Sequence, residues 1–244
     1  MSTVATAPSS LHVSVLGAFG LGDRRHALPP VLGGSQRLLA LLGLRDRTLM
    51  RASVAGTLWP ESSEEHAYSS LRSALVRLNM MSRDAVVVTP IDLRLADGVT
   101  VDIRQGRFLA QQLLDPGTTS ARMDLGAQAV ASLSLDLLPG WYDDWAMLEN
   151  EDWRRLRLQA LEALSDRLLV AGRFGEATNA ASAAVRVEPL RESARALVIR
   201  VHLAQGNQSE ALGEYGRYRA LLRSDLGLEP TMQLRDLVSD LQRR

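Results

Sequence analysis

A short glycine-led pattern occurs twice in the C-terminal half of the chain. Gly172-x-x-x-Glu176-Ala177 returns 34 residues later as Gly206-x-x-x-Glu210-Ala211, and this offset is the period of tetratricopeptide helix pairs. In each copy the glycine can end one helix, and the small alanine lets the next helix pack closely. The pattern predicts stacked helical hairpins. Because at least three units are usually needed for stability, we expect residues 104–170 to supply further helices.

The second copy departs from the period. Glu188-Pro189 and Glu229-Pro230 follow the two copies and are 41 residues apart, not 34. We therefore expect roughly one extra helical turn, or a longer link, in the second copy.

Residues 11–103 consist of shorter elements. A β-like LHVSVLG is followed by a turn-rich connection, the helical segments QRLLALLGL and ASVAGTLW, and a third helix that contains SSLRSALVRL. AVVVTP, DLRLADG and VTVD then read as short strands joined by turns, and Asp97-Gly98 predicts a hairpin turn. Strands, three helices and a terminal hairpin follow one another in this order in a winged helix.

The predicted fold class is therefore mixed. We expect a disordered N-terminal tail at residues 1–10 and an N-terminal α/β winged helix-turn-helix domain at residues 11–103. An all-α tetratricopeptide-like helical repeat domain at residues 104–244 completes the chain.

Composition excludes several classes of protein. With 244 residues, 46% of them hydrophobic, the chain can form one or two domains. It has no cysteine, which excludes disulfides and thiolate metal sites. The first residues lack the pattern of a signal peptide, and no apolar run approaches the ~20 residues of a membrane span. We expect a cytoplasmic, nucleoid-associated protein without a membrane partner.

No catalytic constellation emerges from the residue pattern. The chain has no lysine for a Walker A loop, and its histidines lack metal-ligand spacing. GAFGLG at 17–22 lacks the G-x-G-x-x-G spacing, so we interpret it as a turn after the first strand. Asp143-Asp144 lies between Trp141 and Trp145 where a helix begins, which favours helix capping over acid/base chemistry. We expect no enzyme activity, cofactor or metal.

The third helix of the N-terminal region has two contrasting sides. At about 100° per residue, Ala67, Tyr68, Leu71, Ala74, Leu75 and Leu78 form one apolar stripe that predicts a core contact. The other side carries serines and arginines, and residues 66–83 hold three arginines and no acidic residue. Short side chains allow a helix to approach DNA closely, and arginine can bind guanine or phosphate. An ordinary solvated face in an arginine-rich protein is the alternative.

Nearly the whole chain, residues 11–244, resembles the Streptomyces antibiotic regulatory protein family. The resemblance is carried by GGSQRLLALL at 33–42, VAGTLWPESSEEHAYSSLRSALVRL at 54–78, WYDDW at 141–145 and the long segment EPLRES…DLGLEP at 188–230. It implies a winged helix followed by a bacterial transcriptional activator domain. It also implies a sequence-specific regulator, usually an activator, that binds direct repeats in double-stranded promoter DNA and contacts RNA polymerase holoenzyme. Several copies of the chain could also associate with one another on DNA as a homo-oligomer.

The resemblance also implies site residues. The groove-facing positions of the family's third helix correspond here to Ser69, Ser70, Arg72, Ser73 and Arg77. Positions near the phosphate backbone or the wing correspond to Arg37, Arg51, Thr89 and Arg94, for which exposed or structural roles are the alternative. Relatives continue with basic residues where this chain has Asn79-Met80-Met81.

The loop before the third helix is the candidate polymerase-contact surface, with Glu61, Ser62, Ser63 and Glu64 as the candidate residues. The alternative is purely structural: a buried Trp59, a serine cap and first-turn glutamates. The alternative for the whole chain is a helical-repeat protein-interaction adaptor without specific DNA recognition.

Overall fold

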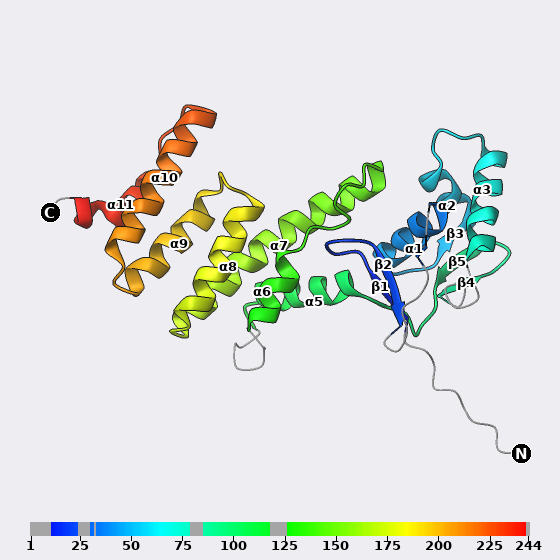
Figure 1. The fold of residues 1–244 in the computed structure, drawn as a ribbon, viewed down its shortest axis with the longest axis horizontal. Helices are drawn as coiled ribbons and strands as arrows, with labels where there is room; N and C mark the ends of the chain where they lie inside the picture. The colour runs from blue at the N-terminus through cyan, green and yellow to red at the C-terminus, as the bar shows by residue number, and fades with distance from the viewer. Residues whose placement is uncertain (1–10, 24–29, 32, 79–84, 118–125, 243–244) are drawn as a thin grey trace, which may run out of the picture. The chain divides into compact units, whose positions relative to one another are not determined.

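The structure, a computed structural model, describes residues 11–23, 30–31, 33–78, 85–117 and 126–242. The predicted tail at 1–10 and the stretch Asn79-Met80-Met81 lie outside these residues. The chain forms two compact units (Figure 1). The N-terminal unit contains the described residues up to Gln105 and also Asp136–Asp152, and the helical unit contains Gly106–Leu135 and the residues from Trp153 onward. The domain division at residues 103 and 104 stays a prediction.

Three helices form the centre of the N-terminal unit. They are α1 (Gly34–Arg45), α2 (Arg51–Leu58) and α3 (Glu64–Arg77), and α3 packs against both of the others. Six of the seven residues from Leu38 to Leu44 are buried leucines or alanine, with the small Gly43 between them. Gly34 permits the close approach of α1, because a Cβ atom at this position would lie 3.0 Å from the Trp59 ring.

Two small sheets flank these helices. In the first, β1 (Leu11–Ser14) lies between β2 (Gly20–Asp23), which is antiparallel to it, and β6 (Thr100–Val101), which is parallel to it. The interpretation of GAFGLG at 17–22 as a turn is therefore only partly right: residues 17–19 lie in the connection, but Gly20, Leu21 and Gly22 belong to β2. In the second sheet, β5 (Asp92–Leu95) lies between β3 (Leu49–Met50) and β4 (Val86–Val88), with antiparallel pairing on both sides.

The prediction of a hairpin at Asp97-Gly98 is wrong. The hairpin after α3 is formed by β4 and β5, and its turn contains Thr89, Pro90 and Ile91. Both edges of β5 are already paired, with β3 and β4, so β6 cannot pair with it. The chain turns at Asp97-Gly98 and adds β6 to β1 instead.

The segment Asp136–Asp152 joins the N-terminal unit although it lies far along the chain. Leu137 forms an isolated antiparallel bridge with Leu16, and the Leu138 amide donates to the Val15 carbonyl oxygen at 2.8 Å. The Trp141 ring packs between Phe19 and Trp145, with both ring-centroid distances 6.1 Å. The N-terminal core is therefore completed by residues that the repeat region contributes.

Every named element after β6 is a helix, as predicted. These helices are α5 (Asp102–Leu114), α6 (Ala127–Ser134), α7 (Asp144–Val170), α8 (Phe174–Val187), α9 (Glu192–Ala204), α10 (Gln208–Leu226) and α11 (Met232–Gln242). Consecutive helices from α8 to α11 pack against one another. None of the helices in the described residues is both long and apolar enough to cross a membrane.

The 34-residue pattern marks two equivalent helix ends. Gly172 and Gly206 have φ values of 72° and 79°, a left-handed conformation that glycine adopts without the steric cost of a Cβ atom. The same backbone bonds close both ends: the amides of Arg173 and Asn207 donate to carbonyl oxygens five residues earlier. Ala177 and Ala211 are fully buried. The extra length that we expected lies in α10, which has 19 residues against 14 in α8.

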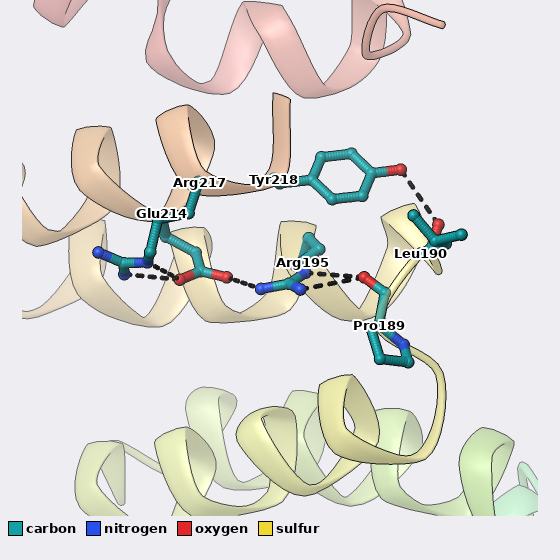
Figure 2. A network of polar contacts seen from close by, with 6 residues as sticks. All are labelled: Pro189, Leu190, Arg195, Glu214, Arg217 and Tyr218. Atoms are coloured by element: carbon teal, nitrogen blue, oxygen red, sulfur yellow. Dashed lines mark hydrogen bonds and ion pairs between the residues drawn. The ribbon is translucent and has the colours of Figure 1, made fainter. Parts of the chain in front are cut away.

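A polar network fastens α9 to α10 (Figure 2). Arg195 donates to Glu214 at 2.5 Å and to the Pro189 carbonyl oxygen at 3.0 and 3.1 Å. Arg217 donates to the other carboxylate oxygen of Glu214 at 2.7 Å. Burial opposes ionisation of Glu214, but the hydrogen bonds from Arg195 and Arg217 outweigh it and lower the pKa of this carboxyl below its ordinary value. Glu214 is therefore an ionised, partnered carboxylate in the helical core.

Candidate nucleic-acid interface

The candidate recognition helix α3 begins with a defined cap. Ser63 is its N-cap residue, and its hydroxyl accepts a hydrogen bond from the His66 amide. Glu64 and Glu65 follow in the first turn, where their charges complement the amide end of the helix dipole. Of the two serines considered as caps, Ser63 has this role. The start of α3 is thus fixed by local chemistry.

The buried side of α3 is centred on small residues as well as leucines. Ala67, Leu71, Ala74 and Leu78 are buried, whereas Tyr68 and Leu75 are only half-buried. On a helical wheel with Leu71 at zero, the buried set is centred at about 330°. Leu75 and Tyr68 lie about 70° and 90° from that centre. The predicted stripe is therefore shifted, and Leu75 lies at its edge.

The opposite side of α3 brings together most of the predicted groove residues. Ser69, Arg72, Ser73 and Arg77 are exposed, and Ser70 is half-buried. Neither Arg72 nor Arg77 forms an ion pair with an acidic side chain in the part of the chain that the structure describes. The direction opposite the centre of the buried set lies at about 150° on the wheel. Arg72, at about 100°, therefore points more directly outward than Arg77, at about 240°.

Val76 is a residue of this face that the sequence reasoning missed. Its side chain is 81% exposed and lies at about 140° on the wheel, between Arg72 and Ser69. The face was identified by its polar residues, which left an apolar side chain unconsidered. Centring the wheel on the smallest apolar residues would have found it. An exposed valine among serines and arginines can contact the methyl group of thymine in the major groove.

Arg37 lies in a different environment from these residues. Its guanidinium donates to the Asp143 carboxylate, and both side chains are partly buried. Asp143 belongs to the segment Asp136–Asp152 that joins the N-terminal unit, and its carbonyl oxygen accepts from the Ala146 and Met147 amides at the start of α7. The charge of Arg37 is therefore balanced within the protein.

The remaining predicted residues lie at the β4–β5 hairpin. Arg51 donates to the Thr89 carbonyl oxygen at 3.3 Å. The Thr89 hydroxyl donates to the Asp92 carboxylate at 2.6 Å and accepts from the Asp92 amide at 3.0 Å, which closes the hairpin turn. Arg94 pairs with Asp97 at 2.5 Å. The structure gives each of these three residues an internal partner; of the predicted arginines, Arg72 and Arg77 on α3 are the ones without such a partner among the described residues.

The loop before α3 presents the candidate polymerase-contact residues to solvent. Glu61, Ser62, Ser63 and Glu64 are exposed, and Ser63 has the capping role as well. Trp59, which we expected to be buried, is half-buried. One side of its ring meets Gly34, and the remainder lines an open cavity together with Glu61 and Ser62.

A protein-family comparison matches the helical part of the chain. Residues 102–242 match the family described as "bacterial transcriptional activator domain". This range includes all the helices from α5 to α11.

Curated relatives include regulators from two bacterial genera. The chain is 28% identical over 215 residues to "Regulatory protein AfsR" of Streptomyces griseus and 29% identical over 208 residues to that of Streptomyces coelicolor. Each alignment covers 82% of this chain and 21% of the relative, so the chain spans about a fifth of the length of these proteins. It is 24% identical to "Transcriptional regulatory protein MoaR1" of Mycobacterium bovis, with 98% of this chain and 82% of that protein covered.

A solved structure has a similar fold. The structure described as "Mycobacterium tuberculosis EmbR in complex with low affinity phosphopeptide" superposes with a TM-score of 0.68 at 22% identity. The superposition covers 96% of this chain and 65% of that chain. The similarity extends over both compact units.

Proposed function

This chain belongs to the Streptomyces antibiotic regulatory protein family, with its bacterial transcriptional activator domain at residues 102–242, and we propose that it is a sequence-specific DNA-binding transcriptional regulator. The observation that carries the proposal is the outward face of α3. Arg72 and Arg77 are exposed there without an internal ion pair among the described residues, beside the short side chains of Ser69 and Ser73. In this proposal the N-terminal unit is a winged helix, α3 enters the major groove, and the β4–β5 hairpin is the wing.

A DNA-binding face must contact both the bases and the phosphate backbone, and the residues of α3 can do both. Arginine can form a bidentate pair with guanine or bind phosphate, and the serines keep the backbone of α3 close to the bases. Arg37 and Arg94 are already paired with Asp143 and Asp97, so we assign them to positioning of α1 and the wing. Contact with phosphate in this proposal comes chiefly from α3.

We further propose that the protein is an activator. It would bind direct repeats near promoters, one copy to each repeat, and contact RNA polymerase holoenzyme in the cytoplasm. The exposed loop residues Glu61, Ser62 and Glu64 are the contact surface in this proposal. Ser63 is unsuitable as a probe of that contact because it also caps α3.

The experiment that tests DNA recognition is selection from a random duplex library, followed by affinity measurements at several salt concentrations. The full chain is the appropriate sample, because residues 136–152 complete the N-terminal unit. We expect a defined repeat to be selected. A plot of the logarithm of its binding constant against the logarithm of the salt concentration should have a slope of about −0.9 for each phosphate contact. Failure to select any sequence would favour the adaptor function.

Activation is tested separately with Glu61→Ala in a reconstituted transcription assay. The variant should bind the selected repeat with unchanged affinity and give less transcript. An unchanged amount of transcript would show that this loop does not contact the polymerase, and it would not affect the proposal of DNA recognition.

A further inference from the structure

A continuous line of exposed side chains runs along α3 and begins at a histidine. Four exposed residues follow one another at intervals of three, four and four positions: His66, Ser69, Ser73 and Arg77. Residues at these intervals lie one above another on the same side of a helix. The last three belong to the DNA-binding face proposed above, and His66 extends that face into the first turn of α3.

The serine that caps α3 also holds the side chain of His66. The Ser63 hydroxyl oxygen accepts from the His66 amide at 3.4 Å, and it lies 2.8 Å from Nδ1 of the same residue. The bond from the amide uses a lone pair of this oxygen, so the hydroxyl proton is free to be donated to Nδ1. A neutral imidazole that accepts at Nδ1 carries its own proton on Nε2. The cap therefore favours the Nε2–H tautomer of His66.

This tautomer leaves one N–H donor of His66 without an acceptor in the protein. Among the described residues, the ring has no hydrogen-bond partner other than Ser63. In helix-turn-helix proteins, the N-terminal residues of the recognition helix contact the edges of bases. Both purines present N7 in the major groove as an acceptor. A single outward N–H group at this end of α3 therefore matches a purine N7.

The charges of the first turn favour a base edge over a phosphate group as the acceptor. Glu64 and Glu65 are exposed and directly precede His66. Their carboxylates repel a phosphate, which carries a negative charge. N7 of a purine is an uncharged acceptor and does not meet this repulsion.

We propose that His66 is a specificity-determining residue, which donates from Nε2–H to N7 of a purine in the major groove. Ser63 then has two roles, because it caps α3 and holds the imidazole in the tautomer that donates. His66 and Arg77 are 11 positions apart on α3, or about 17 Å, so they reach bases about five base pairs apart. The contact rests on the DNA recognition proposed above, whereas the tautomer is a property of the protein without DNA.

The first measurement determines the tautomer in the full chain without DNA. In ¹⁵N-histidine-labelled protein, the chemical shifts of the ring nitrogens distinguish the protonated atom from the unprotonated one. The spectrum is recorded at alkaline pH, where histidine side chains are neutral, and the His66→Ala variant identifies the signals. We expect the proton of His66 on Nε2. A proton on Nδ1 would overturn the proposal, whether or not the chain binds DNA.

The second measurement replaces each purine of the selected repeat in turn by its 7-deaza analogue, in which a carbon atom takes the place of N7. Fluorescence anisotropy gives the affinity of the unmodified chain and of His66→Ala for each duplex. At one position the analogue should weaken binding of the unmodified chain by about three- to tenfold, the effect of one neutral hydrogen bond. At that position it should have no effect on His66→Ala. An analogue at a base that Arg77 contacts should weaken binding of both proteins.

Three variants separate a base contact from a structural effect. His66→Ala keeps the cap, because the bond to Ser63 comes from the backbone amide. His66→Gln keeps an N–H donor at the end of its side chain and should recover part of the affinity that His66→Ala loses. His12→Ala is the matched control, since Nδ1 of His12 in β1 lies 2.9 Å from the Thr100 hydroxyl. It removes a similar histidine–hydroxyl pair and should bind every duplex as the unmodified chain does.

The results distinguish failure of this contact from failure of the function on which it rests. If a repeat is selected but every 7-deaza analogue has the same effect on the unmodified chain and on His66→Ala, the contact is wrong and the proposed function stands. A loss in His66→Ala that is equal on all sequences would identify a phosphate contact and would also overturn the proposal. If no repeat is selected, both proposals fail.

Discussion

The Ser35 hydroxyl in α1 donates a hydrogen bond of 2.6 Å to the Ala74 carbonyl oxygen in α3. Ala74 lies in the last turn of α3, where carbonyl oxygens lack partners within the helix. Ser35 is 2% exposed, so water cannot replace this contact. The C-terminal end of the proposed recognition helix is therefore fastened to α1 by a buried polar contact as well as by apolar packing.

Ser35→Ala should destabilise the N-terminal unit by about 1–2 kcal/mol, because it leaves a buried carbonyl oxygen without its partner. Urea unfolding followed by circular dichroism measures the loss. Ser73→Ala, an exposed serine of α3, is the control and should change the free energy of unfolding by less than about 0.5 kcal/mol. Equal losses in the two variants would contradict the role of Ser35.

Leu71→Ala should cost about 2–5 kcal/mol, because Leu71 is fully buried and its removal leaves a cavity. Leu75→Ala, which the sequence alone assigns to the same stripe, should cost less than about 2 kcal/mol, because Leu75 is half-buried. The same unfolding measurement compares them. A larger loss for Leu75→Ala would contradict the shifted orientation of α3.

Arg77→Ala should weaken binding to the selected repeat by about 1–3 kcal/mol and relax the preference at one base pair, if Arg77 reads a base. Arg72→Ala, which is closer to the outward centre of α3, should cost at least as much. Fluorescence anisotropy with labelled duplexes measures both affinities. Arg223→Ala, an exposed arginine of α10, should leave binding unchanged. If neither α3 variant changes the affinity or the base preference, this face of α3 is not part of the DNA interface.

Val76→Ala should lower affinity for the selected repeat by about 1 kcal/mol, because it removes two methyl groups from an apolar contact. The loss should disappear when the contacted thymine is replaced by uracil, which lacks the methyl group. Val170→Ala is a matched control, since Val170 is also helical and is 87% exposed. The same loss on thymine and uracil duplexes would exclude the methyl contact.

Glu214→Gln should destabilise the helical unit by about 2–3 kcal/mol at neutral pH, because Arg195 and Arg217 lose their charged partner. The pKa of Glu214 is lowered in the folded state from its ordinary value of 4.5. Its stabilising contribution is therefore present above pH 4.5 and is lost as the pH falls through the lowered pKa. Urea unfolding between pH 3 and 8 should show the two proteins converging at the acid end. A difference that grows at low pH would contradict this sign.

Local patterns were sufficient to predict most of the elements. The 34-residue spacing predicted the helix ends at Gly172 and Gly206, because a left-handed glycine and a small packing residue act within one turn of the chain. The extra length in the second copy, expected as a helical turn or a longer link, followed from the 41-residue separation of Glu188-Pro189 and Glu229-Pro230. The α3 stripe and the Ser63 cap were predictable for the same reason, since a period and a cap involve residues that are neighbours along the helix.

Tertiary structure decided what depends on distant partners. The turn at Asp97-Gly98 looks like a hairpin locally, but β6 pairs with β1 because both edges of β5 are already occupied. No local signal in the sequence assigns Asp136–Asp152 to the N-terminal unit. None predicts the contact between Arg37 and Asp143 either, because these residues are 106 positions apart. Val76 points outward because Ala67 and Ala74, together with Leu71 and Leu78, orient α3. The sequence by itself determined that the chain from about residue 104 is helical, the helix ends at Gly172 and Gly206 and the serine cap of α3, since those are short-range effects. The orientation of α3 and the cavity beside it were decided by contacts between segments far apart in the chain, which no periodicity encodes.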